Sequence, residues 1–211
     1  MERESLKLYL VTDRKIAGER NLEEIVSEAV KGGVTMVQLR EKDISTREFI
    51  ELATRLRKKL QQAGIPLIIN DRVDVALAVD ADGVHIGQSD MPYETARRIL
   101  GPDKIIGLSV ESLDDVRTAN GLDVDYIGIS PIYPTPTKTD TAPAFLQEGL
   151  REAVAISKHP CVGIGGMNKD TAAETIRNGA AGIAVVSAII GADNPRKAAE
   201  ELLNIIENGR I

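Results

Sequence analysis

The chain has 211 residues, 43% of them hydrophobic and 27% charged, which is enough to bury one large core. Its net charge of −6 argues against nonspecific nucleic-acid binding, which needs clustered positive charge. The single cysteine, Cys161, lies in an apolar run and excludes an intrachain disulfide. The charged N-terminus and the lack of a long apolar run predict a cytoplasmic protein without a membrane span.

Short β-branched runs alternate with longer segments of helical periodicity along the whole chain. The predicted strands cover residues 8–11, 35–39, 67–69, 83–86, 105–108, 126–129, 162–164 and 183–186. The predicted helices cover about 22–31, 45–63, 73–79, 93–100, 112–119, 145–156, 169–177 and 195–206. The second helix begins with Ser45 and has Glu48 three residues later, which is a capping-box pattern.

Eight apolar strands, each followed by an amphipathic helix, indicate an α/β fold with a parallel sheet covered by helices. Eight such units fit a closed TIM (β/α)8 barrel, although periodicity alone leaves a doubly wound open sheet as an alternative. No linker or break in composition divides the sequence. We therefore predict a single catalytic domain over residues 1–211, with its site at the C-terminal ends of the strands.

The second predicted strand ends in Gln38-Leu39-Arg40-Glu41-Lys42, in which every residue except Leu39 is polar or charged. Alternation places Gln38, Arg40 and Lys42 on one side, where arginine can grip a phosphate with two hydrogen bonds and lysine adds a point charge. The alternative is a solvated charged turn. At a strand end of a barrel, the phosphate-binding interpretation is favoured.

Two aspartates follow neighbouring strands of the predicted barrel. Asp71 follows the third strand and Asp90 comes shortly after the fourth, so both could hold one Mg²⁺ together with phosphate oxygens and water. The alternative is a pair of loop-capping aspartates. His85 and His159 have no clustered partners and are interpreted as structural residues rather than metal ligands.

Four further strand ends offer groups for a ligand. Ser109 ends the fifth strand, and a proline-stiffened segment carrying Thr135, Thr137 and Lys138 follows the sixth. That segment is either a fixed array of ligand-binding groups or a rigid surface crossover. Gly165-Gly166 and Val186-Ser187 follow the last two strands, where many barrels bind phosphate through backbone N–H groups. The residues thus predict two anion sites, one cationic with a metal and one neutral.

These segments, in this order, resemble the thiamine phosphate synthase family over nearly the whole chain. The matching segments are residues 9–13, 37–42, 69–72, 84–90, 107–110, 133–140 and 163–166. Met167 stands where isoleucine is more usual, a mild apolar change. The resemblance implies a transferase that joins hydroxymethylpyrimidine diphosphate to a thiazole phosphate, plain or carboxylated, and releases pyrophosphate.

The resemblance also implies a role for each site residue. The residues implied to bind the pyrimidine diphosphate are Gln38, Leu39, Arg40, Glu41, Lys42, Asn70, Ser109 and Lys138. Those implied to bind the thiazole phosphate are Thr135, Pro136, Thr137, Gly166, Val186 and Ser187. Arg40, Ser109 and Lys138 are implied to act in catalysis, and Asp71 and Asp90 to bind Mg²⁺.

Two other functions fit parts of the pattern. A thiazole tautomerase resembles this family, but it needs neither a metal nor a diphosphate site. A phosphate-ligand sensor without catalysis needs only tight binding. Both leave the full set of charged strand-end residues unexplained. The expected partners are small phosphorylated substrates, with neither nucleic acid nor membrane, and a homo-oligomer stays open.

Overall fold

The computed structural model describes residues 2–134 and 143–209 and shows a closed barrel of eight parallel strands. The strands are β1 (Leu8–Val11), β2 (Met36–Leu39), β3 (Leu67–Asn70), β4 (Gly83–Ile86), β5 (Ile105–Val110), β6 (Tyr126–Ile129), β7 (Cys161–Ile164) and β8 (Gly182–Val185). Each strand pairs with the next, and β8 pairs back with β1, with Leu8 opposite Ile183. The predicted TIM barrel is therefore confirmed, and the open sheet is excluded.

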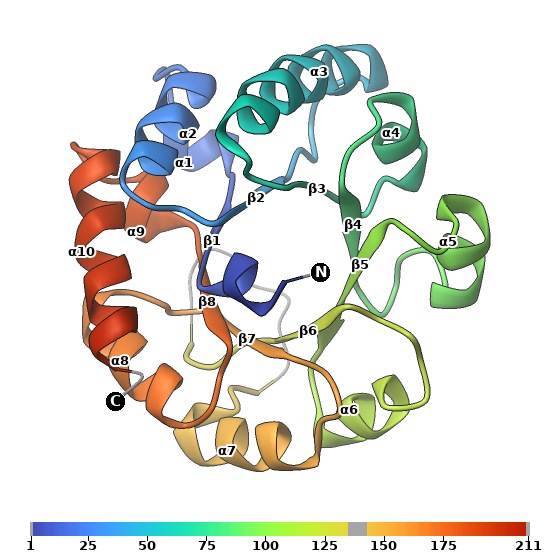
Figure 1. Ribbon diagram of the computed structural model, residues 1–211, viewed down its shortest axis with the longest axis vertical. Coiled ribbons are helices and arrows are strands. Elements are labelled where there is room, and N and C mark those ends of the chain that lie inside the picture. Colours follow the sequence, from blue (N-terminus) through green and yellow to red (C-terminus); the bar gives the residue numbers. More distant parts are fainter. Residues whose placement is uncertain (1, 135–142, 210–211) are drawn as a thin grey trace.

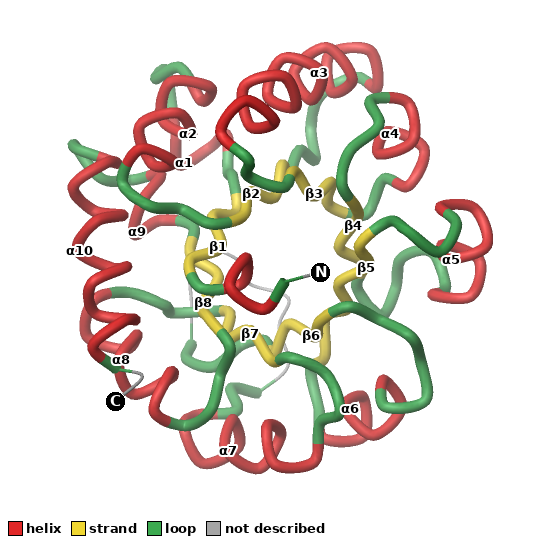
Figure 2. The backbone as a smooth tube through the Cα atoms, in the orientation of Figure 1, coloured by secondary structure: helices red, strands yellow, loops and turns green. Residues whose placement is uncertain are grey.

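The helices form a ring around the barrel (Figures 1 and 2). They are α1 (Arg14–Ala17), α2 (Leu22–Lys31), α3 (Thr46–Ala63), α4 (Val73–Ala78), α5 (Tyr93–Leu100), α6 (Leu113–Ala119), α7 (Leu146–Ile156), α8 (Lys169–Arg177), α9 (Ser187–Ile190) and α10 (Pro195–Asn208). The predicted capping box starts α3, where the Ser45 and Glu48 side chains each accept a hydrogen bond from the other residue's backbone N–H. Among the described residues, no helix has the length and apolar character needed to cross a membrane.

Three single-turn elements were not predicted from the sequence. These are the 3-10 helix η1 (Arg3–Leu6), α1 and α9, each four residues long. One turn is too short to show a repeating apolar face, so sequence periodicity cannot detect it. Strand β5 also runs beyond Ser109 to Val110, which places that serine inside the strand rather than at its end.

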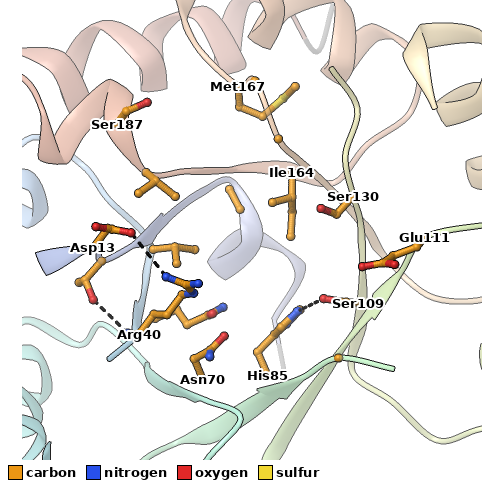
Figure 3. Close-up of a pocket in the computed structure, with 18 of the residues that line it drawn as sticks. Asp13, Arg40, Asn70, His85, Ser109, Glu111, Ser130, Ile164, Met167 and Ser187 are labelled. Carbon is orange, nitrogen blue, oxygen red and sulfur yellow. Dashed lines mark hydrogen bonds and ion pairs between the residues drawn. The ribbon is translucent and has the colours of Figure 1, made fainter. Parts of the chain in front are cut away.

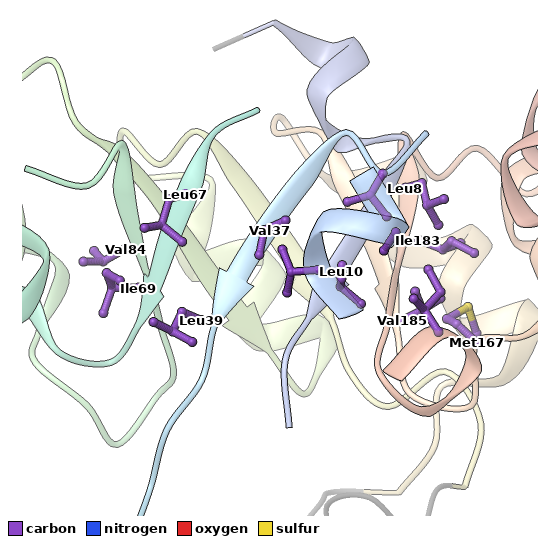
Figure 4. Close-up of a cluster of buried hydrophobic side chains, with 14 of the residues drawn as sticks. Leu8, Leu10, Val37, Leu39, Leu67, Ile69, Val84, Met167, Ile183 and Val185 are labelled. Atoms are coloured by element: carbon purple, nitrogen blue, oxygen red, sulfur yellow. The ribbon is translucent and has the colours of Figure 1, made fainter. Parts of the chain in front are cut away.

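Side chains alternate along the strands between two separate cores. Outward residues such as Leu10, Val37 and Ile69 are fully buried against the helices (Figure 4). Inward residues such as Tyr9 and Tyr126 form a second cluster inside the barrel. The inner cluster includes Leu6 from η1, and in Figure 1 that short helix lies across the barrel axis. Apolar packing thus closes the N-terminal end of the barrel, and the polar residues lie toward the other end.

Candidate active site

A pocket of about 860 Å³ opens at the C-terminal ends of the strands, a size typical of small-molecule sites. Its lining includes the predicted residues Gln38, Arg40, Lys42, Asn70, Asp71, Asp90, Ser109, Gly166, Val186 and Ser187. Figure 3 shows several of them converging from different strands. The structure therefore brings together all the predicted site residues that it describes except Leu39 and Glu41.

Strand alternation separates the residues of the run after β2. Gln38, Arg40 and Lys42 line the pocket, whereas Leu39 is fully buried in the outer core. The Glu41 side chain is 2% exposed and accepts hydrogen bonds from Arg14 Nε and Nη2, at 3.1 and 2.8 Å. Leu39 and Glu41 therefore support the strand end from behind, and their side chains do not line the pocket.

Residues of the loop that follows β1 orient Arg40. Asp13 Oδ2 lies 3.5 Å from Arg40 Nη1, and its Oδ1 accepts from Ile16 N as the cap of α1. Thr12 Oγ1 accepts a hydrogen bond from Arg40 N at 3.0 Å. Thr12 and Asp13 both line the pocket, but sequence reasoning gave neither a role. Because Asp13 holds one side of the guanidinium, Arg40 is oriented in the pocket wall before any ligand binds.

The two predicted metal ligands, Asp71 and Asp90, lie side by side at the same edge of the pocket. The pKa of Asp90 is raised, first by burial and then by a side-chain hydrogen bond with Asp71. Asp90 Oδ2 also accepts from Gly87 N at 2.7 Å, and Asp71 Oδ2 lies 2.5 Å from Lys42 Nζ. Two crowded carboxylates of this kind suit a shared divalent cation, which removes their mutual repulsion.

The described residues hold no cluster of three or more His, Cys, Asp or Glu side chains that would enclose a metal ion. A cation between Asp71 and Asp90 would take its other ligands from phosphate oxygens and water, as Mg²⁺ commonly does. The donor set therefore fits a metal that binds together with a phosphorylated substrate.

The residues of the predicted neutral anion site line the pocket where β7 and β8 end. Gly165 and Gly166 have φ values of +89° and +69°, which favour glycine. A Cβ on Gly166 would lie 2.7 Å from Tyr133 Cβ, so the turn has no room for a side chain. Ser187, the first residue of α9, also lines the pocket. Thr135, Pro136, Thr137 and Lys138, which were predicted to complete the site, lie outside the described residues.

The pocket floor contains His85, which the sequence predicted to be a structural residue rather than a metal ligand, and Gln88, which had no predicted role. His85 lines the pocket, and its Nε2 lies 2.8 Å from Ser109 Oγ (Figure 3). Burial lowers the pKa of His85 to about 4, so the ring is neutral. Gln88 Nε2 donates to the Ser109 carbonyl at 2.6 Å. One sequence signal could have placed His85 in the pocket. Side chains alternate along β4, and this alternation turns His85 toward the barrel interior near the C-terminal end of the strand.

A barrel with a cationic edge, an acid pair and a glycine-rich turn at one mouth defines an enzyme that acts on small phosphorylated molecules. Residues 8–189 match the thiamine monophosphate synthase family, and the chain belongs to that family. It is 52% identical to the thiamine-phosphate synthase of Albidiferax ferrireducens, over 97% of this chain and 93% of that one. It is also 52% identical to the Vibrio parahaemolyticus thiamine-phosphate synthase, over 95% of this chain and 98% of that one.

A solved structure agrees with these relatives. Thiamine phosphate pyrophosphorylase from Pyrococcus furiosus superposes with a TM-score of 0.90 at 44% identity, covering 98% of each chain. Sequence and structural relatives therefore point to the same transferase reaction, and they support neither the tautomerase nor the sensor.

Proposed function

We propose that the pocket joins hydroxymethylpyrimidine diphosphate to a thiazole phosphate, giving thiamine phosphate and pyrophosphate. One observation carries the proposal: one pocket is lined by a charged group of residues and by a neutral glycine turn. Arg40 and Lys42 form the charged group with the acid pair, and Gly166 lies in the neutral turn. A diphosphate suits the charged edge, and a monophosphate suits the neutral turn.

The reaction breaks a C–O bond at the pyrimidine methylene and forms a bond from that carbon to the thiazole nitrogen. The aminopyrimidine can delocalise positive charge at the methylene carbon, so the leaving pyrophosphate needs most of the stabilisation. We assign that role to Arg40, Lys42, Ser109 and Lys138, whose cationic or hydroxyl groups would face the developing negative charge. No protein nucleophile is required.

We assign Asp71 and Asp90 as the residues that hold Mg²⁺. When bound, the ion would neutralise charge on the leaving pyrophosphate. Asn70 and Gln38 would orient the diphosphate and the pyrimidine. Thr135, Pro136, Thr137, Gly166, Val186 and Ser187 would bind the thiazole phosphate. With both phosphates held in one pocket, the two reacting atoms would meet over the pocket floor.

The setting of the reaction also stays a prediction. We propose a cytoplasmic enzyme whose partners are its small phosphorylated substrates rather than nucleic acid, supported by the net charge of −6. Whether copies of the chain associate is a separate question, which sedimentation of the purified protein would answer.

The test is a two-substrate assay with and without EDTA, following thiamine phosphate and pyrophosphate together. We expect equal amounts of both products with Mg²⁺, loss of turnover with EDTA, and recovery when Mg²⁺ is restored. Turnover that survives EDTA would remove the metal assignment. Folded protein that makes no product, but isomerises the thiazole phosphate alone, would replace the synthase with the tautomerase.

A further inference from the structure

Five side chains form a continuous line of hydrogen bonds beneath the pocket. Gln38 Nε2 donates to the Tyr9 hydroxyl at 2.7 Å, and the Tyr9 and Tyr126 hydroxyl oxygens are 2.8 Å apart. The Tyr126 hydroxyl lies 3.0 Å from His85 Nδ1, and His85 Nε2 lies 2.8 Å from Ser109 Oγ. The line therefore joins Gln38 and Ser109 in the pocket wall through Tyr9 and Tyr126 inside the barrel and His85 on the pocket floor.

The three middle residues of the line have little freedom to move. Tyr9 and Tyr126 are fully buried, and His85 is 5% exposed. Glycine makes the space for two of these rings, because a Cβ on Gly107 would lie 2.1 Å from Tyr126 Cζ, and one on Gly128 would lie 3.2 Å from His85 Cε1. Tight packing therefore holds the aromatic rings in line, with each tyrosine hydroxyl oxygen placed between its two neighbours in the line.

When every hydrogen bond of the line is made, the number of protons permits only two arrangements. Each tyrosine hydroxyl has one proton, and the neutral His85 ring has one N–H and one acceptor nitrogen. In the first arrangement, Gln38 donates to Tyr9, Tyr9 to Tyr126, Tyr126 to His85 Nδ1, and His85 Nε2–H to Ser109 Oγ. In the second, every donor becomes an acceptor and the Gln38 amide turns over.

The structure has the first arrangement at its Gln38 end, where the amide nitrogen faces Tyr9. In that arrangement Ser109 accepts from His85, so its own O–H is available to donate to a ligand in the pocket. In the reverse arrangement, Ser109 would donate to His85 and present only lone pairs, which repel phosphate oxygens. The first arrangement is thus the one compatible with an anionic ligand beside Ser109.

We propose that Tyr9, Tyr126 and His85 are positioning residues that form a directional hydrogen-bond line, which makes Ser109 a donor and the Gln38 carbonyl an acceptor toward the substrate. The direction of the hydrogen bonds is inferred from the geometry of the line. Their effect on substrate binding rests on the proposed function. The line also couples the two ends, because reversing the polarity at one requires reversing it at the other. Gln38 would then select a pyrimidine that offers an N–H group.

The first test reads the His85 tautomer by ¹⁵N NMR of histidine-labelled protein at neutral pH. The chain has two histidines. His159 Nε2 lies 2.9 Å from the Ala119 carbonyl oxygen, which can only accept, so His159 is an internal reference for an Nε2–H ring. A His85→Gln variant identifies which signals belong to His85. We expect His85 to be Nε2–H, and an Nδ1–H ring would overturn the proposal.

The second test breaks the line with Tyr126→Phe. His85 Nδ1 then loses its donor, so we expect a mixture of tautomers instead of one. Tyr93→Phe is the matched control, because its hydroxyl donates to the Asp123 carbonyl at 2.8 Å, outside the pocket. An unchanged His85 tautomer in folded Tyr126→Phe would contradict the proposal. If that variant does not fold, the wild-type tautomer still decides.

The third test asks whether Tyr126 acts through Ser109. We expect Tyr126→Phe to lower kcat about ten-fold, because misplacing a reacting group slows catalysis, while KM for the thiazole phosphate is unchanged. In a Ser109→Ala background the same change should have little further effect. Additive losses would show that Tyr126 acts independently of Ser109. If the wild type makes no product, the proposed function fails, and the NMR result still decides the direction of the line.

Discussion

Lys42 Nζ lies 2.5 Å from Asp71 Oδ2, so one ion pair joins a predicted diphosphate ligand to a predicted metal ligand. The pair turns these two groups toward each other, so Lys42 and one Asp71 oxygen are engaged with each other rather than with a ligand. A cation taking Asp71 would release Lys42 toward the phosphate that arrives with it. Metal and diphosphate should therefore bind cooperatively, each favouring the arrangement that the other needs.

Asp71→Asn tests this exchange. The neutral amide is a weaker cation ligand and no longer pairs with Lys42, so we expect the Mg²⁺ concentration for half-maximal turnover to rise about ten-fold or more. The measurement is a Mg²⁺ titration of turnover, repeated with calorimetric Mg²⁺ binding in the presence of pyrophosphate. Asp74→Asn is the control, because Asp74 pairs with Arg72 outside the pocket. Equal shifts in both variants would refute the exchange.

Gly166→Ala tests the neutral anion site. The φ of +69° strains an alanine by about 1–2 kcal/mol, and its Cβ would crowd Tyr133. We expect KM for the thiazole phosphate to rise about ten-fold, while KM for the diphosphate stays the same. Gly121→Ala is the control, because the nearest atom to its Cβ would be 3.4 Å away. A rise confined to the diphosphate KM would place the thiazole phosphate elsewhere.

Arg14→Ala tests the support behind Arg40. Arg14 is half exposed, whereas its partner Glu41 is buried. The change therefore leaves the buried Glu41 carboxylate without its ion-pair partner. We expect the free energy of unfolding to fall by about 1–3 kcal/mol. Adding Glu41→Gln should restore part of that loss, since a buried amide is less costly than a buried charge. Urea denaturation measures both, and a double variant less stable than Arg14→Ala would contradict the expectation.

His85 should make stability depend on pH. Its pKa is lowered from 6.5 to about 4 by burial, so between these values the unfolded chain binds a proton that the folded chain does not. Stability therefore falls as pH drops from 6.5 toward 4, and the shift corresponds to about 3 kcal/mol. Unfolding experiments on wild type and His85→Gln should show a shallower fall in the variant. The His159→Gln variant keeps His85, so it should retain the part of the fall in stability that His85 causes.

The sequence predicted the barrel because its strands and longer helices are strongly periodic. It predicted residues that the structure places in one pocket, because phosphate and metal chemistry require recognisable residue types, such as Arg40 and Asp71, at strand ends. It gave Tyr9 and Tyr126 no role and interpreted His85 only as a structural residue, since residues in a strand interior resemble core packing. Their hydrogen bonds join β1, β4 and β6, and pairings across a closed barrel leave no local pattern along the chain.

The pairing of β1 with β8 sets an order of events during synthesis. Leu8 of β1 pairs with Ile183, which is synthesised much later. The edge of β1 that pairs with β8 therefore stays unpaired while most of the chain emerges from the ribosome. Open edges invite pairing with other chains, and such distant contacts form slowly. Because β1 has only four residues, it exposes few unpaired backbone groups to other chains before the barrel closes.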